Sequence, residues 1–375
     1  MPITSRVAKN AYLAFNRGLA MLPQLIHESC LICCIVLLAI ATLASEGATA
    51  AETAQAVTLY PGYELGRGLK LNDTGLTLGG YATVEYNQLK DTDPRLTLSH
   101  TSLLLWWEGQ GHFKFFSEVD LENAVATRYS SGDADARYLS LERLYLDYVF
   151  SDSLTLRFGK FLTPIGRWNL IHADPLTWTT SRPLVTQSVF PDNATGGMAT
   201  GTVFALGQPI DYSIYVTSGQ EFRADPKQDP FSDAQGIHVN VPLSDSSQIG
   251  FSYATFHQDG SPNEKKSLTG VDFLWSHNRY EISGEAVSRN SNPGAHREER
   301  GAFMQAVAPI SDRLYAVGRM ETFRSVGSIT PIRLRLIGLV FRVNPALSIK
   351  MEFLNALHND VAPQDGFMSS LSILF

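Results

Sequence analysis

Hydrophobic and polar residues alternate with a period of two along much of the chain after residue 75. In one such stretch Phe113, Phe115, Val119 and Leu121 alternate with charged residues, and the stretch 347–353 repeats the pattern. This alternation predicts β-strands that have one apolar face and one polar face. A soluble β-sandwich shows the same alternation, so the pattern alone does not select the architecture.

The alternation and the turn residues that interrupt it predict sixteen strands. Most of them approach the length of about 9–11 residues with which a tilted strand crosses a bilayer. The predicted strands are 76–87, 95–107, 112–122, 139–150, 154–162, 197–206, 210–218, 236–243, 247–257, 267–276, 279–289, 299–309, 312–323, 331–342, 346–356 and 366–375.

The predicted connections alternate in length as well. Links after even-numbered strands are tight, as at Ser151–Ser153 and His277–Asn278, whereas links after odd-numbered strands are long and polar, as at Gly219–Gln235. Short turns at one end and long loops at the other are typical of outer-membrane barrels. We therefore predict an all-β fold, a transmembrane antiparallel β-barrel over 76–375 with about sixteen strands. Eighteen strands are the alternative if Arg182–Pro191 contains a further hairpin.

Aromatic residues gather beside the predicted tight turns. A ring at a bilayer boundary buries its face in lipid and turns its edge to the headgroups. The residues are Trp107, Phe113, Phe150, Tyr212, Trp275, Tyr280, Phe341 and Phe375. The alternating end Leu371–Phe375 resembles the signal that the bacterial barrel-assembly machinery reads, so we expect this machinery to be a partner through Phe375.

The start of the chain shows the three features of a secretory signal peptide. Basic residues precede an uncharged stretch at 29–45, and the small residues Ala48–Ala50 follow it. The basic residues are Arg6, Lys9 and Arg17. A transmembrane anchor is the competing interpretation, although 17 residues lie at the short limit for a span.

We therefore predict a signal peptide over 1–50, cleaved near Ala50, and a short periplasmic segment over 51–75. Met21 is an alternative start. Export after cleavage, together with the predicted barrel, places the protein in the bacterial outer membrane, with lipid as its surroundings.

Composition excludes two classes of function. The net charge is −7 and no basic block occurs, so we expect no nucleic-acid partner. The three cysteines, Cys30, Cys33 and Cys34, all lie in the predicted signal peptide. The exported chain would then have no thiol for a disulfide or for nucleophilic catalysis.

Catalytic motifs are missing from the sequence. It has no Gly-x-Ser-x-Gly, no His-Glu-x-x-His and no phosphate-binding glycine loop. The nearest candidate for a barrel hydrolase is the triplet His358–Asp360, which is a signal of low specificity. We expect no enzymatic activity, no cofactor and no metal ion.

The link between the fifth and sixth predicted strands, 163–196, is far longer than the others. It holds four prolines and two tryptophans, which argues against disorder, and loops of this length are usually functional. We expect it to fold into the barrel and narrow it; an external lid or a trimer contact is the alternative. The candidate pore residues are Lys114, Glu118, Asp120, Arg143, Tyr145, Asp147, Arg157, Lys160, Arg167, His172, Asp174 and Arg182.

A barrel this wide encloses water, so its inward residues should be polar, and strand parity then assigns charges to the lumen. The predicted inward bases are Lys114, Arg143, Arg157, Arg319, Arg333, Arg335 and Lys350. The predicted inward acids are Glu85, Glu118, Asp120, Glu122, Asp147, Asp211, Asp272, Glu281, Glu285, Glu321 and Glu352. Mixed signs predict modest ion selectivity. Lys160 has outward parity unless Gly159 forms a bulge, which we expect.

The stretch 145–169 resembles the corresponding hairpin of the phosphate-selective porin (porin O and porin P) superfamily. Its most specific part is Gly159-Lys160-Phe161 followed by Thr163-Pro164-x-Gly166, and the similarity covers about residues 62–200. The resemblance implies a passive, water-filled and homotrimeric diffusion channel. Phosphate selectivity does not follow, because it needs a cluster of cationic side chains and no segment here is dense in lysine or arginine.

Three functions remain open at this point. The leading hypothesis is a general or weakly selective porin for small hydrophilic solutes or ions. The alternative is a substrate-specific channel in which the long loop, Tyr145, Tyr215 and Trp106 bind an organic anion, phosphate or sugar. An outer-membrane hydrolase is the least favoured of the three.

Overall fold

The computed structural model describes residues 62–127, 137–171, 173–205, 207–219, 221–222, 224–292, 297–357 and 365–375. They belong to one compact unit, Tyr60–Phe375. The predicted signal peptide 1–50, its cleavage near Ala50 and the first part of the segment 51–75 lie outside the described residues. The rest of that segment forms β1 (Tyr63–Glu64), β2 (Gly68–Lys70) and the 3-10 turn η1 (Asn72–Thr74), and β2 pairs with the next strand.

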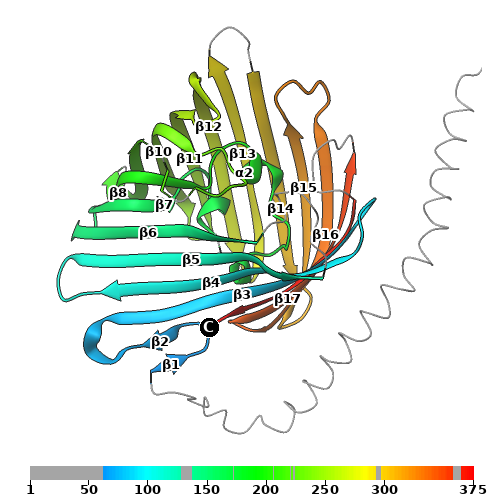
Figure 1. The fold of residues 1–375 in the computed structure, drawn as a ribbon, viewed down its shortest axis with the longest axis horizontal. Helices are drawn as coiled ribbons and strands as arrows, with labels where there is room; N and C mark the ends of the chain where they lie inside the picture. Colours follow the sequence, from blue (N-terminus) through cyan, green and yellow to red (C-terminus); the bar gives the residue numbers. More distant parts are fainter. Residues whose placement is uncertain are drawn as a thin grey trace, which may run out of the picture. The chain divides into compact units, whose positions relative to one another are not determined.

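Sixteen further strands in the described part of the chain form a closed antiparallel barrel (Figure 1). Each strand pairs with its neighbours in sequence, and the last pairs with the first, so every strand of the wall has a partner on both sides. This confirms the predicted fold. The strands are β3 (Leu76–Leu89), β4 (Arg95–Glu108), β5 (Phe113–Ala126), β6 (Tyr138–Ser151), β7 (Leu154–Leu162), β8 (Asn193–Ala205), β9 (Gln208–Ser218), β10 (Phe231–Ser244), β11 (Ser247–Gln258), β12 (Ser261–His277), β13 (Tyr280–Asn292), β14 (Arg297–Pro309), β15 (Leu314–Arg324), β16 (Ile332–Asn344), β17 (Leu347–Leu357) and β18 (Gly366–Leu374).

The barrel closes where β18 runs antiparallel to β3, from the pair Gly366↔Leu89 to the pair Leu374↔Tyr81. Phe375 and Gly80 continue this pairing by exchanging two backbone hydrogen bonds of 2.8 Å. A Cβ atom on Gly80 would lie 2.8 Å from the Phe375 ring, so the absence of a side chain lets the ring approach. The C-terminal aromatic residue is therefore part of the closing contact.

The predicted alternation of short and long links is present with two exceptions. β13 ends at Asn292 and β14 begins at Arg297, so this link is shorter than the expected 290–298 and no longer than the tight link 310–313. The link between β11 and β12 is only Asp259–Gly260, whereas we expected a loop over 258–266. Residues 261–266 are polar on both faces of the strand, and a strand without an apolar face shows no alternation in its sequence. The eighteen-strand alternative is also wrong, because 182–191 contains the helix α2 (Leu184–Ser188) rather than a hairpin.

The outer face of the barrel carries large apolar side chains. Leu103, Met320 and Ile337 have exposed fractions of 58%, 68% and 70%. Aromatic rings such as Phe113 and Phe150 are exposed beside the tight turns. An apolar band with aromatic residues at its edge is the surface that a membrane barrel turns to lipid. Among the described residues, no helix combines the length and apolar character needed to cross a membrane.

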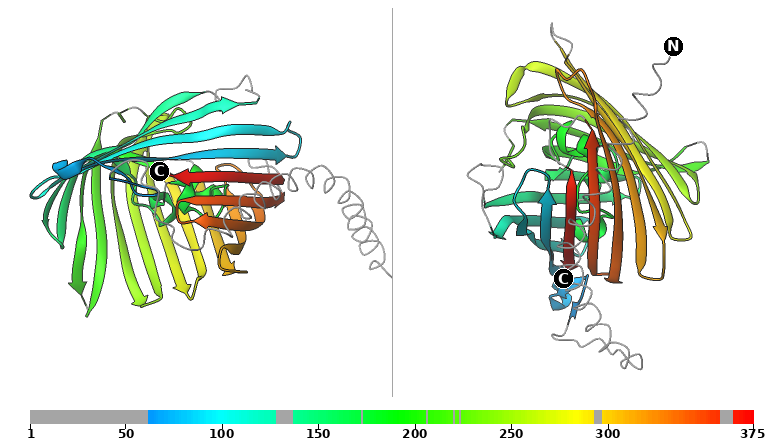
Figure 2. Two further views of the ribbon diagram at one scale, coloured as in Figure 1. Left: turned by 90° about the horizontal axis from the view of Figure 1, so that it is seen from below. Right: turned by 90° about the vertical axis from the view of Figure 1, so that its right-hand side faces the viewer.

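The inner face is polar only in part. The loop 163–192 lies inside the ring of strands, and α2 contacts β14 and β15 (Figure 1, Figure 2). Leu184 of α2 joins Phe323, Leu334 and Leu336 in a buried apolar cluster. The expectation of a uniformly polar interior is therefore wrong, because the loop displaces water from this part of the wall and apolar side chains gain free energy by burial there.

Two of the predicted lumen bases, Arg333 and Arg335, lie on the outer face. In the β15–β16 pair, Leu334 stands opposite Glu321 and Arg335 opposite Met320, and residues paired across strands share a face. Leu334 and Glu321 are buried inside, whereas Met320 and Arg335 are exposed. The prediction was wrong because it assumed that polar residues point inward, while β16 turns its apolar residues toward the loop.

Candidate channel constriction

The long loop leaves β7 after Leu162 and joins β8 at Asn193, so it spans 163–192 rather than the predicted 163–196. It contains the 3-10 turns η3 (Trp168–Leu170) and η4 (Asp174–Leu176), followed by α2. Prolines stand in the first turn of η4 and just before α2. Proline fixes φ and lacks an N–H group, which suits helix starts and favours short turns over a strand.

Three inward glutamates hold the backbone of this loop. Glu285 on β13, Glu321 on β15 and Glu352 on β17 accept backbone N–H groups that an irregular loop would otherwise leave unpaired. The donors are Arg167 (2.7 Å) and Trp168 to Glu285, Leu184 (2.7 Å) to Glu321, and Thr180 and Ser181 (2.8 Å each) to Glu352. We expected these carboxylates to line the lumen; they lie inside the barrel, but they fix the loop.

Two inward bases hold the same loop. Arg319 on β15 and Lys350 on β17 are both buried, and Arg319 also pairs with Glu321 at 2.7 Å. The acceptors in the loop are Thr179 Oγ1 and Ser181 Oγ for Arg319 (2.7 Å each) and Asp174 O and Thr177 Oγ1 for Lys350 (2.6 Å each). Loss of either base would leave buried polar groups without a partner, which is costly.

Asp174 joins the loop to another part of the wall. Its Oδ2 atom lies 2.9 Å from His100 Nδ1, and His100 Nε2 lies 2.9 Å from Glu122 Oε1. Burial opposes ionisation of Asp174, but the attraction of His100 and Lys350 holds the pKa of its carboxyl well below the usual range. Glu85, His100 and Asp174 also place ligand atoms within 4.8 Å of one another, as a metal site would. The two carboxylate contacts of His100 already engage both ring nitrogens.

The described part of the link 219–230, between β9 and β10, also contacts the interior. Lys160 Nζ donates to Phe222 O at 3.2 Å and lies 3.3 Å from Glu221 Oε1, so Lys160 points inward as expected. The register of β6 and β7 continues through Gly159 without a shift, so the expected bulge is wrong. Instead Gly159 has φ +131°, a left-handed conformation that redirects the next side chain at little cost for glycine.

The inner wall of β5, β6 and β7 carries what we name the arginine–aromatic ladder: Phe116, Arg143, Tyr145 and Arg157. Phe116 and Tyr145 stack with ring centroids 5.4 Å apart. Arg143 lies 4.5 Å from the Phe116 centroid, and Arg157 lies 3.6 Å from the Tyr145 centroid. Each arginine also pairs with a carboxylate: Arg143 with Glu118, and Arg157 with Asp147 through bonds of 2.8 and 2.9 Å. The ladder is a partly buried surface of alternating cations and rings, with 20% of the Arg143 side chain and 22% of the Arg157 side chain exposed.

The structure brings some predicted site residues together and separates others. Glu118, Arg143, Tyr145, Asp147 and Arg157 meet in and beside the ladder, and their role in conduction stays a prediction. Lys114 lies beside them, opposite Asp147 in the β5–β6 pair, and also pairs with Glu108 at 3.2 Å. Apart from them lie Asp120, which accepts a bond from Tyr81 at 3.3 Å, and Arg182, 3.5 Å from Asp192. His172 lies outside the described residues. Tyr215 is buried against Phe161, which removes it from the residues that could bind a solute.

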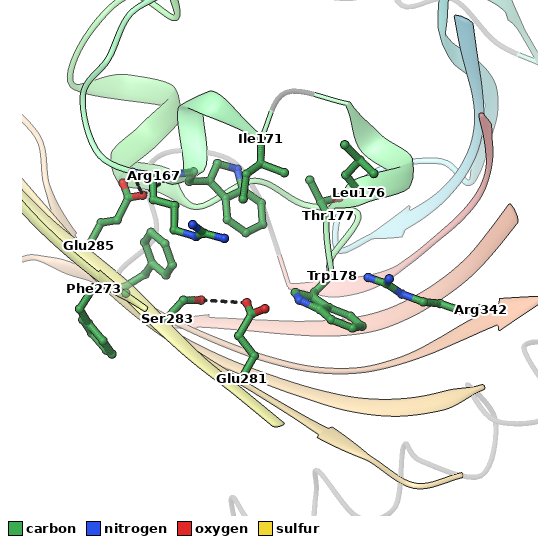
Figure 3. A pocket seen from close by; sticks show the side chains of 13 residues that line it. Arg167, Ile171, Leu176, Thr177, Trp178, Phe273, Glu281, Ser283, Glu285 and Arg342 are labelled. Atoms are coloured by element: carbon green, nitrogen blue, oxygen red, sulfur yellow. Dashed lines mark hydrogen bonds between the residues drawn. The ribbon is translucent and has the colours of Figure 1, made fainter. Parts of the chain in front are cut away.

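A cavity of about 270 Å³ lies between the loop and β13 (Figure 3). Arg167, Trp178, Glu281 and Arg342 line it, together with the apolar Ile171 and Leu176. Glu281 stands at the start of β13 and Arg342 near the end of β16, so the cavity lies toward the tight-turn end of the barrel. Sequence reasoning did not identify Trp178, Arg342 or His100. Arg342 has the same parity along β16 as the inward Leu334. Assigning the correct face of β16 to the interior would therefore have identified Arg342 as an inward residue.

Comparisons with known proteins agree with the barrel. No family model matches the chain. It is 21% identical over 359 residues to an uncharacterized protein of Aquifex aeolicus (strain VF5), covering 80% of each chain.

Solved structures resemble the chain in fold at low sequence identity. An anion-selective porin from Comamonas acidovorans has a TM-score of 0.56 and 12% identity, covering 80% of this chain and 98% of its own. The outer membrane channel DcaP of Acinetobacter baumannii has a TM-score of 0.55 and 12% identity, covering 82% and 100%. OmpT, an outer membrane protein of Vibrio cholerae solved in a trimer form, has a TM-score of 0.55 and 10% identity, covering 80% and 99%. What this chain shares with these proteins is the closed barrel fold of outer-membrane proteins.

Proposed function

We propose that the protein is an outer-membrane porin, a passive water-filled channel for small hydrophilic solutes or ions, with no enzymatic activity. The observation that carries the proposal is the loop 163–192, which is held inside the barrel by Glu285, Glu321 and Glu352. A loop fixed in this way narrows the interior on one side without depending on the membrane or on a partner. The remaining passage runs beside the arginine–aromatic ladder.

The ladder supports weak rather than strong ion selectivity. Its two arginines are each neutralised by an adjacent carboxylate, so the wall presents closely spaced opposite charges. Such an arrangement creates a local field across the passage, while its net charge is near zero. The field therefore orients a polar solute, but it discriminates little between cations and anions.

Phosphate selectivity, which the resemblance to phosphate-selective porins would suggest, has less support. It requires several cationic side chains that are free to meet one anion, whereas Arg143, Arg157 and Arg319 are each bound to a carboxylate. Arg167 and Arg342 form no ion pair within the described residues, but they share their cavity with Glu281 and Glu285. A channel specific for an organic solute is the second candidate, and the cavity beneath the loop favours it. A hydrolase has the least support, because its nearest candidate in the sequence, the triplet His358–Asp360, is a signal of low specificity; this triplet lies outside the described residues.

The proposal extends to assembly and location. We infer a homotrimer in the outer membrane, as the trimer form of OmpT and the outwardly apolar wall suggest. The tight turns would face the periplasm and the long loops the outside. A signal peptide over 1–50 and recognition of Phe375 by the barrel-assembly machinery belong to the same proposal.

Planar-bilayer recording of the refolded protein tests the channel. We expect discrete conductance steps, and a reversal potential near zero in a salt gradient because the ladder is nearly neutral. Refolded barrels that insert in the bilayer but give no steps in any salt would contradict the proposal. Cross-linking in detergent would show whether three copies associate.

A further inference from the structure

Two arginines inside the barrel differ from the others. Arg143, Arg157, Arg289 and Arg319 each pair with a carboxylate on the wall. Arg167 and Arg342 have no such ion pair within the described residues, and both line the cavity of about 270 Å³ beneath the loop. A guanidinium that is not neutralised has donors available for a carboxylate of a solute.

Arg167 and Glu281 bring opposite charges to the same cavity. Arg167 reaches into it from the loop and Glu281 from β13 (Figure 3). They form no ion pair in the described structure, although both are partly accessible. The side-chain bond from Ser283 Oγ to Glu281, at 3.5 Å, is long. Glu285 and Arg342 also line the cavity, but the Glu285 carboxylate accepts the backbone N–H groups of Arg167 and Trp168, and Arg342 stacks on Trp178. Arg167 and Glu281 are therefore the cation and the anion of this cavity that keep bonding capacity for a third group.

Apolar side chains complete the cavity. Ile171 and Leu176 line it from the loop, and Trp178 lies beside Glu281 in Figure 3. The Trp178 ring is fixed by two contacts: Arg342 lies 4.0 Å from its centroid, and Tyr315 packs against it with centroids 5.0 Å apart. Arg342 thus acts as a positioning residue for the ring, since a stacked guanidinium holds the ring plane in place.

We propose that this cavity is a binding site for a small amphipathic zwitterion, such as an α-amino acid with an apolar side chain. The carboxylate of the solute binds Arg167, its ammonium group binds Glu281, and its apolar part packs on Trp178, Ile171 and Leu176. The proposal rests on the proposed channel, because the site then lies along the passage at the tight-turn end. The inference adds to the proposed function the class of solute that binds transiently in the channel.

The test uses three probes of similar size: phenylalanine, N-acetylphenylalanine, which has only the carboxylate, and phenylalanine amide, which has only the ammonium group. Each is added to the refolded full-length barrel while the single-channel current is recorded. Phenylalanine should block the current at a concentration about tenfold lower than either derivative, because it alone makes both charged contacts. Equal block by all three probes would overturn the proposal.

Variants locate the site. Glu281→Gln should make phenylalanine and N-acetylphenylalanine equally weak blockers, and Arg167→Gln should do the same for phenylalanine and its amide. Arg167→Lys keeps the charge and should retain most of the block. Arg313→Gln makes the same charge change on an exposed turn at the same end, and it should leave the block unchanged. Block that survives both Gln variants would overturn the assignment.

Calorimetric titration of the refolded barrel with phenylalanine separates this inference from the proposed channel. Binding of phenylalanine without conductance would contradict the proposed channel, but it would support the assignment of the cavity as a binding site. Conductance without binding of phenylalanine, or without block by it, would support the proposed channel and contradict the proposed binding site.

Discussion

Two parts of the inner wall use the same residue types for different purposes. On β13, β15 and β17 the charged residues Glu285, Arg319 and Glu352 are buried against the loop and bond to its backbone and hydroxyl groups. On β5, β6 and β7 the charged residues pair with each other and with aromatic rings of the same wall. The position of a charged residue inside a barrel therefore does not by itself define its role; its partners show whether it anchors the loop.

The largest effect should come from placing a charge where the loop meets the wall. Leu184 is 2% exposed in the apolar cluster, and Leu184→Asp would bury an unpaired carboxylate at a cost of about 5 kcal/mol or more. We expect the loop to leave the wall and the single-channel conductance to rise. Protease cleavage within 163–192 should report the same release.

Leu170→Asp is the matched control, since Leu170 lies on the same loop but is 45% exposed. It should leave both the conductance and the protease resistance close to those of the natural sequence. Equal effects of the two substitutions would mean that the apolar cluster does not hold the loop.

A smaller loss should follow from removing one buried base. Arg319→Ala leaves Glu321 and two loop hydroxyl groups without their donor, which typically costs about 3–5 kcal/mol. Thermal unfolding in detergent should show reduced stability, and the current should become noisier as the loop moves. Arg333→Ala, on the outer face, should stay within about 0.5 kcal/mol. If the two substitutions destabilise equally, Arg319 is not an anchor.

The ladder should control ion preference with little effect on stability of the loop. Arg143→Gln combined with Arg157→Gln leaves the buried carboxylates of Glu118 and Asp147 on the inner wall without their cationic partners. The reversal potential in a salt gradient should then shift toward cation selectivity. Arg333→Gln combined with Arg335→Gln removes the same charge from the outer face and should produce no comparable shift. A similar shift from both pairs would argue against a passage at the ladder.

The smallest effect is expected from mild acid. The pKa of Asp174 is lowered in the folded protein, so its contribution to holding the loop is complete above its usual value of 3.8. That contribution is lost only as the pH falls through the lowered pKa. Between about pH 7 and pH 5, Asp174 should remain ionised and its hold on the loop should not change. A change in conductance over this range that Asp174→Asn abolishes would contradict this.

The fold was predictable from the sequence because a barrel wall in lipid imposes a strict pattern. Alternation along β5 and β17, and the tight turns at one end, follow directly from a wall that has lipid on one face. The prediction failed where that condition fails. Residues 261–266 are polar on both faces, and β16 turns Leu334 and Leu336 inward because the loop replaces water there.

The candidate site was predictable only where neighbouring strands determine it. Arg143, Asp147 and Arg157 lie on adjacent strands with inward parity, so their proximity follows from the hairpin. The contacts of the loop do not, because Asp174 meets His100 across many residues and an irregular backbone has no periodicity to read. For the same reason Trp178, which lies on the loop, gave no signal in the sequence, whereas Arg342 was missed because the wrong face of β16 was assigned to the interior.

The junction between the first and last strands has a consequence for biogenesis. Side chains that touch across it, Thr83 and Ser372, are separated by 289 positions in the chain. Bringing such distant segments together carries an entropic cost. The barrel also cannot close until its last strand has been synthesised. A truncated translation product would have two edge strands whose backbone N–H and C=O groups are unpaired. In the hydrocarbon layer no other groups are present to pair with them. Synthesis therefore yields either a complete barrel or an incomplete fragment that is unstable in a bilayer.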